Sequence, residues 1–289
     1  MTCRLYKPDS NHYNTPTMPE LPEAESISRA LDRALKGRRI SKIEVFFPRL
    51  RTPLSPLLES GLVGRSFTGC RRRARYVVAD LDDGRALTMH FGMSGVVRVE
   101  DAALPRRKHE HVFIHLSDGH VFRFEDPRRF GSLEVQKIGA DGWPESLAKI
   151  GVEPLSPGFS GDFLYAASRK RKKPVKELLM DNAVVTGIGN IYAAETLFAC
   201  GISPLRKASE LSAGECRAIV REVKRILRLA IKCGGTTVSD YRNVDGSEGR
   251  FARKLKIYGK SECLVCGGKT EKPVLGGRTS WYCPACQKR

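Results

Sequence analysis

Hydrophobic positions recur first at helical spacing and then in short strand-like runs. Just after Pro22, one helical face carries Ala24, Ile27, Leu31 and Leu35. Gly37 then predicts the end of that helix. Runs rich in β-forming residues follow at 43–47, 76–81, 86–91, 96–99, 111–116 and 120–125. Their number and spacing predict a β-sandwich or a β-barrel.

The pattern becomes helical after about residue 150. An apolar helical run at residues 191–200 should end at Gly201. Ser212 and Glu215 have capping-box spacing, and the long amphipathic helix behind them should end at Gly234. The sequence therefore predicts an α+β protein with a β-rich part, a helical part and a small C-terminal unit. The expected boundaries are 18–150, 151–262 and 263–289, preceded by an extension at 1–17 that is polar, without periodicity and expected to be disordered.

Four cysteines near the C-terminus have the spacing of a zinc site. Cys263 and Cys266 form one pair, Cys283 and Cys286 form another, and sixteen residues separate the two pairs. Four thiolates can complete a tetrahedron and leave no position for water, so we expect one structural Zn²⁺. Two disulfides in a secreted protein are the alternative, which the lack of a signal peptide disfavours.

The charge of the chain narrows the choice of partner. Its 289 residues include 50 Lys and Arg against 32 Asp and Glu, a formal net charge of +18. Such an excess is usually matched to a polyanion. Membrane headgroups are also anionic, but no apolar anchor accompanies the charge. We therefore expect an intracellular protein that binds nucleic acid and no membrane.

The stretch from Met18 to Glu23 contains residues suited to covalent chemistry. If Pro19 is the first residue of the mature chain, its secondary amine can attack an electrophilic sugar carbon and form an iminium. The neighbouring carboxylate of Glu20 can move protons on the same substrate. The structural alternative is a loop that leads into a helix with Pro22 in its first turn.

Several motifs together resemble those of the bacterial formamidopyrimidine-DNA glycosylases, which are bifunctional enzymes for oxidised purines. The similarity runs from Met18 to the C-terminus and rests on these segments: MPELPE at 18–23, HFGMSG at 90–95, DPRRFG at 126–131, LMDNAVVTGIGNIYAA at 179–194 and the four cysteines. The resemblance implies an N-terminal β-sandwich with flanking helices, a helix–two-turns–helix domain and a zinc ribbon. It also implies double-stranded DNA with a damaged base or abasic site as the partner of a monomeric protein in the bacterial cytoplasm, associated with the chromosome.

The resemblance also implies site residues. Met93, Arg128 and Phe130 match the residues that fill the space left by a flipped nucleotide. Residues expected to contact the DNA backbone are Lys176, Asn190, Arg278 and His109, the last in a region that also holds His111. Asn190 is also expected as a possible helix N-cap, and both roles can hold together because the side chain can cap while a backbone amide faces phosphate. The segment from Asp245 to Phe251 resembles the loop that covers the flipped purine.

Two departures from the family pattern affect the chemistry. Pro19 is preceded by residues 1–18, and a proline nitrogen in an amide bond is no nucleophile, so we expect translation to start at Met18, which is then removed. Second, the family motif RR-x-KY has Arg75 in place of its lysine. Arginine keeps the charge but is a poor proton donor near neutral pH.

Three functions therefore remain open. The first is an active DNA glycosylase and abasic-site lyase that removes 8-oxoguanine and formamidopyrimidines by β,δ-elimination, with Pro19, Glu20 and Arg75 in its catalytic site. The second is a lesion-binding protein that no longer cuts DNA. The third is a basic zinc-ribbon transcription factor, which gives Pro19 and Glu20 no role.

Overall fold

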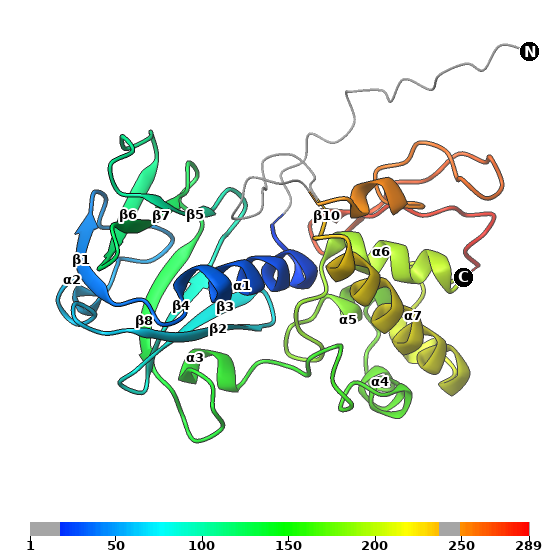
Figure 1. Ribbon diagram of the computed structural model, residues 1–289. Helices are drawn as coiled ribbons and strands as arrows, with labels where there is room; N and C mark the ends of the chain where they lie inside the picture. Colours follow the sequence, from blue (N-terminus) through cyan, green and yellow to red (C-terminus); the bar gives the residue numbers. More distant parts are fainter. Residues whose placement is uncertain (1–17, 237–248, 289) are drawn as a thin grey trace, which may run out of the picture.

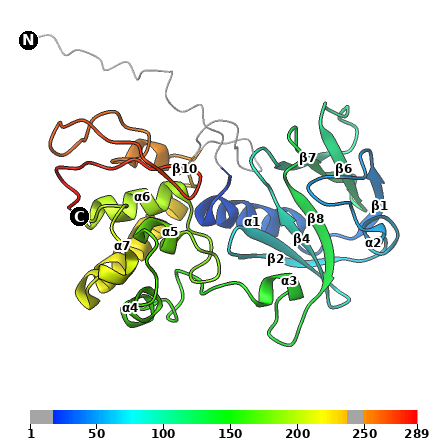
Figure 2. The same ribbon diagram turned by 180° about the vertical axis from the view of Figure 1, so that it is seen from behind.

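The computed structural model describes residues 18–236 and 249–288. The expected extension at 1–17, and most of the segment that resembles a purine-covering loop, lie outside the described residues. A β-rich half and a helical half lie side by side, and the first helix α1 (Leu21–Leu35) extends from one to the other (Figures 1 and 2). Helix α1 packs on strands of the first half and against the long helix of the second.

The β-rich half is a sandwich of two antiparallel four-stranded sheets, which confirms one of the two predicted architectures. One sheet has the order β1 (Ile40–Val45), β6 (Glu110–Leu116), β7 (His120–Glu125) and β5 (Val96–Asp101). The other has the order β2 (Phe67–Arg73), β3 (Tyr76–Leu81), β4 (Arg85–His90) and β8 (Ser132–Lys137). Apolar side chains of both sheets meet in one core, among them Val77, Met89, Val112 and Phe122. Short helices α2 (Pro56–Ser60) and α3 (Glu145–Ala148) lie in the connections.

The helical half is built around two helices that match the predicted ones closely. Helix α6 spans Asn190–Ala199, and the amphipathic α7 spans Ala213–Lys232. The predicted capping box is present at the start of α7, where Ser212 Oγ accepts from Glu215 N (3.2 Å). Shorter elements complete this half: α4 (Gly161–Ser168), α5 (Val175–Leu179), η1 (Ala208–Glu210) and η2 (Phe251–Lys254). Among the residues that the structure describes, no helix is both long and apolar enough to cross a membrane.

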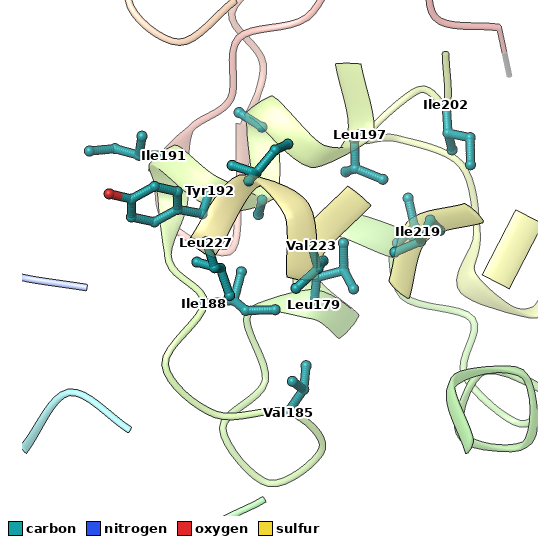
Figure 3. Close-up of a cluster of buried hydrophobic side chains, with 14 of the residues drawn as sticks. Leu179, Val185, Ile188, Ile191, Tyr192, Leu197, Ile202, Ile219, Val223 and Leu227 are labelled. Carbon is teal, nitrogen blue, oxygen red and sulfur yellow. The ribbon is translucent and has the colours of Figure 1, made fainter. Parts of the chain in front are cut away.

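A second hydrophobic core holds the helical half together. Figure 3 shows its side chains, with Ile191 and Tyr192 near one end of α6 and Leu197 near the other, packed above Val223 and Leu227 of α7. All five are buried. This packing fixes the direction of α6 and so determines where its N-terminus points.

The C-terminal unit carries a two-stranded ribbon, β9 (Val274–Leu275) and β10 (Arg278–Thr279). Trp281 and Cys283 of this unit belong to the same core as α6 and α7, so the ribbon is packed on the helical half. Its tip residue Arg278 is thereby held at the junction between the two halves of the molecule.

Candidate active site

A cavity of about 340 Å³ lies where the start of α1, the β2–β3 turn, the start of α6 and the ribbon meet. Its walls contain Met18, Glu20, Arg75, Met93, Asn190, Tyr258, Gly277, Arg278, Thr279 and Trp281. Five of these were predicted as site residues from the sequence: Glu20, Arg75, Met93, Asn190 and Arg278. The fold therefore gathers into one cavity predicted residues from the start of the first helix, the β-rich half, the helical half and the C-terminal ribbon.

Glu20 closes the N-terminus of helix α6. Its carboxylate accepts hydrogen bonds from the backbone N–H groups of Gly189 (2.7 Å), Ile191 (3.0 Å) and Tyr192 (3.4 Å). Gly189 is the N-cap of this helix, so the expected role of Asn190 as N-cap is wrong. A side chain at position 189 has no room, because its Cβ would lie 2.3 Å from Glu20 Cδ.

Burial sets the proton affinity of Glu20. Loss of water contact raises the pKa of this carboxyl to about 7, against the opposing effects of the positive charge of Arg75 and the amides of α6. The group therefore exists in both protonation states near neutral pH. A carboxyl with this pKa can donate and accept a proton at the same pH, as general acid–base catalysis requires.

Pro19 is buried directly beside this carboxylate, and Met18 lies in the cavity wall. A free nitrogen on Pro19 would carry out its chemistry next to Glu20. Pro19 itself is not part of the cavity wall, but it lies between Met18 and Glu20, which both are.

Arg75 follows a tight turn between β2 and β3. Ala74 in this turn has φ of 56°, the left-handed region. The guanidinium Nη2 donates to the carbonyl oxygen of Ile188 (2.7 Å), and Nη1 lies 3.9 Å from Met18 Sδ. Burial lowers the pKa of Arg75, whereas the charge of Glu20 opposes this effect. Arg75 therefore links the β-sandwich to the turn before α6 and directs positive charge at the cavity.

Behind the cavity wall, Lys176 and Asn190 form a polar cluster with the ribbon. Lys176 Nζ donates to Asn190 Oδ1 (2.5 Å) and to Ser280 Oγ (2.5 Å), and Asn190 Nδ2 donates to the carbonyl oxygen of Thr279 (3.0 Å). Burial lowers the pKa of Lys176 to about 7. Asn190 and Arg278 line the cavity, and the buried Lys176 behind them adds positive charge, which suits a phosphate.

Met93, Arg128 and Phe130 come from two loops that pack against each other. Gly92 has φ of 57°, and a Cβ there would lie 2.5 Å from the backbone of Phe130. The buried Asp126 joins the loops because it accepts from Ser94 Oγ (2.5 Å) and from Gly131 N (2.8 Å). Phe130 is 46% exposed, and the Arg128 guanidinium lies 4.9 Å from its ring centre. The three predicted insertion residues are thus presented together by a rigid base.

His90 was missed as a site residue by the sequence analysis. It lines a second cavity of about 550 Å³, together with Met18, Met93 and Phe130. Its Nδ1 accepts from Gly92 N (3.2 Å), so its proton is on Nε2, and burial lowers its pKa to about 4. The sequence did contain a signal for it, because His90 is the first residue of the HFGMSG segment on which the resemblance rests. His109, which was predicted, lies in neither cavity wall and has its ring 6.4 Å from that of His111.

The four predicted zinc ligands come together in the ribbon. Their sulfur atoms all lie within 4.8 Å of one another, with 3.8 Å between Cys263 and Cys286 and 3.5 Å between Cys266 and Cys283. A tetrahedral zinc with Zn–S bonds of about 2.3 Å needs sulfurs about 3.8 Å apart. All four are free thiols, which contradicts the disulfide alternative. The cysteines form a structural zinc site.

Comparison with known proteins agrees with this geometry. Three family models match the chain: the formamidopyrimidine-DNA glycosylase N-terminal domain at residues 18–133, the H2TH domain of the same glycosylase at 150–242, and the zinc finger found in FPG and IleRS at 260–289. The formamidopyrimidine-DNA glycosylase of Xanthomonas campestris is 45% identical over 273 residues, which cover 94% of this chain and 100% of the relative. That of Alcanivorax borkumensis is 44% identical over 273 residues, with the same coverage.

Solved structures show the same similarity. A mutant of Lactococcus lactis FPG in complex with Fapy-dG-containing DNA has a TM-score of 0.85 and 31% identity, covering 94% of this chain and 100% of that one. The Lactococcus lactis enzyme with abasic-site DNA has a TM-score of 0.84 and 30% identity, covering 93% and 100%. The chain therefore belongs to the formamidopyrimidine-DNA glycosylase family.

Proposed function

We propose that this protein is a base-excision repair glycosylase that removes 8-oxoguanine and formamidopyrimidines from duplex DNA and then cleaves the abasic site. The observation that carries the proposal is the position of Glu20, next to Pro19 in the chain, in the wall of a cavity that also contains Arg75 and Arg278 at the N-terminus of α6. The DNA-containing complexes among its structural relatives support the same substrate class.

Recognition begins with removal of the damaged nucleotide from the duplex, because a stacked base cannot reach the cavity. Met93 and Phe130 enter the space that it leaves, and Arg128 bonds to the orphaned partner base. Asn190, Lys176 and Arg278 hold phosphates near the extruded nucleotide. The apolar side chains separate the stacked bases, and the cations keep the bent backbone in place.

Covalent chemistry follows at Pro19. Its nitrogen lone pair forms a bond to C1′ while the bond from C1′ to the base breaks, and loss of the amine proton leaves a neutral N,O-acetal. The nitrogen lone pair then expels the ring oxygen O4′ from C1′, which opens the sugar and forms the iminium. Glu20 protonates the opening sugar ring and takes up protons in the later steps. Elimination of the 3′ phosphate and then of the 5′ phosphate leaves a gap of one nucleoside.

Borohydride trapping tests the assignment of the nucleophile. Protein that starts at Pro19 should form a stable adduct with DNA that contains 8-oxoguanine or an abasic site. Protein that retains residues 1–18 should bind the same DNA without forming the adduct, because its Pro19 nitrogen lies in an amide bond. Equal trapping by both proteins would mean that another amine is the nucleophile.

Glu20→Gln separates the two activities of the proposed enzyme. This variant should bind lesion DNA and lose base excision, while some cleavage of preformed abasic sites remains because no glycosidic bond needs to break. Arg75 in the place of the family lysine favours one alternative, a lesion-binding protein that no longer cuts. That alternative predicts tight lesion binding with no excision by protein that starts at Pro19.

A further inference from the structure

A groove of about 480 Å³ lies on the helical half, outside the candidate active site. It is formed by the C-terminal turn of α6, the middle of α7, the short helix η2 and the first zinc knuckle. Its walls are Glu195, Phe198, Ala199, Arg225, Ile226, Leu229, Phe251, Arg253, Lys254, Lys256 and Val265. No role in the proposed repair reaction falls to this groove.

The floor of the groove is apolar. Ile226 and Phe251 are buried beneath it, and Phe198 and Leu229 are only partly covered by protein. At its edge Val265 is 71% exposed, and the adjacent Leu264 is 61% exposed. Apolar surface of this kind next to a hollow is typical of a binding site for a bulky hydrophobic side chain.

The rim of the groove is cationic. Arg225, Arg253, Lys254 and Lys256 have exposed side chains around it. The one carboxylate in the wall belongs to Glu195 and is buried. Its oxygens accept hydrogen bonds from the backbone N–H groups at 256–258 (2.9–3.0 Å). Arg225 pairs with Glu222 (2.7 Å), whereas within the described ranges the other three cations have no ion pair. The groove therefore attracts carboxylates from outside.

The groove and the candidate DNA site lie at opposite ends of α6. The DNA site uses Asn190 at the first position of the helix, and the groove uses Ala199 at the last. Nine residues at 1.5 Å each separate them by about 13 Å along the axis. Figure 3 shows this arrangement along the helix, with Ile191 and Leu197 toward opposite ends of α6. The groove and the cavity share no wall residue, so we expect an occupant of the groove to leave the cavity open to DNA.

We propose that the groove docks an acidic peptide segment of a partner protein, with one bulky apolar side chain on the floor and carboxylates against the rim. Duplex DNA offers the charge but has no protruding apolar side chain to fill the floor. A second copy of this chain is disfavoured because each carries a net charge of +18. A groove of about 480 Å³ holds only a few side chains, so we expect weak, micromolar binding.

Fluorescence anisotropy with a labelled peptide tests the proposal. The probe is a run of aspartates that ends in leucine and phenylalanine, and a control peptide replaces those two residues with serine. The wild-type protein should bind the probe with a Kd in the micromolar range and the serine peptide about tenfold more weakly. Equal affinity for both peptides would mean that only the overall charge attracts them and would overturn the proposal.

Two protein variants locate the binding. Lys254→Glu reverses a charge on the rim and Ala199→Trp places a bulky side chain in the wall of the groove, so each should weaken probe binding about tenfold. Lys36→Glu makes the same charge change at the exposed end of α1 and should leave probe binding unchanged. Lys254→Glu and Lys36→Glu change the net charge equally and should affect binding of lesion duplex equally, and Ala199→Trp should leave it unchanged. Displacement of the probe by lesion duplex, or equal probe affinity across the variants, would contradict the assignment of this groove.

Discussion

Arg75 has a fixed charge at the position where the motif RR-x-KY, which the sequence resembles, has a lysine with a titratable charge. Its guanidinium bonds to the Ile188 carbonyl oxygen (2.7 Å) and lies close enough to Glu20 to lower the pKa of that carboxyl. Both effects need only a positive charge and a side chain long enough to reach these two groups. Delivery of a proton to the substrate is a third role, and arginine fills it poorly because it rarely loses its proton.

Arg75→Lys separates these roles. Lysine keeps the charge and can donate a proton, so we expect single-turnover excision of 8-oxoguanine to become faster, by about 10²-fold if this position delivers a proton. Arg75→Met is the matched control, since it keeps a long side chain without charge and should slow excision. Equal rates for the wild type and Arg75→Lys would show that the position serves only as a cation.

At the level of elements, helix α6 joins binding to catalysis because its first turn faces both Glu20 and the candidate phosphate contacts. Gly189→Ala tests this connection. The backbone of Gly189 (φ −121°, ψ −158°) suits any residue, but the new Cβ would lie 2.3 Å from Glu20 Cδ. Glu20 must move, so we expect excision to fall by about 10²-fold or more and the helix cap to weaken by about 1 kcal/mol.

Gly214→Ala is the control for this substitution. Gly214 lies in the first turn of α7, and its nearest neighbour to an added Cβ is Ser212 Oγ at 3.8 Å, an ordinary contact. Alanine there should stabilise the protein by about 0.5–1 kcal/mol and leave excision unchanged. Thermal unfolding and single-turnover excision measure the two effects, and wild-type activity in Gly189→Ala would contradict the proposed coupling.

The sequence predicted those elements whose pattern is local. Strands β3 and β7 and the capping box of α7 have the predicted residues, whereas β2 and β8 were missed. Strand β2 ends in three arginines, which resemble a solvated surface run. In the structure Arg71 pairs with Asp80 (2.7 Å), and Arg72 pairs with Glu153 (2.8 Å). Asp80 lies on the neighbouring strand, nine residues from Arg71, whereas Glu153 lies 81 residues from Arg72. A partner as distant as Glu153 leaves no periodic signal, and for the same reason the cap that Glu20 forms on α6 was not predicted.

For the whole molecule, the positive charge should make DNA binding fall steeply with salt. Arg278 lies at the tip of the ribbon and in the cavity wall, where we assign it to a phosphate. Arg278→Ala should weaken binding to all sequences about equally and make the slope of log K against log salt shallower by about 1. Lys36→Ala removes an equal charge at the far end of α1, about 20 Å from Glu20. It should change the slope less than Arg278→Ala does. A loss confined to one base context would contradict the backbone assignment.

Glu20 at the N-terminus of α6 and Lys176 behind it should link DNA binding to the binding of protons. Each group has a pKa of about 7, so in the free protein each is partly protonated. A phosphate brought close favours the protonated form of both and raises both pKa values. DNA binding should therefore take up protons, and its affinity should fall as pH rises from about 6 to about 8. Calorimetry in buffers of different ionisation enthalpy counts these protons: Glu20→Gln should lower the count, and a binding enthalpy independent of buffer would contradict this linkage.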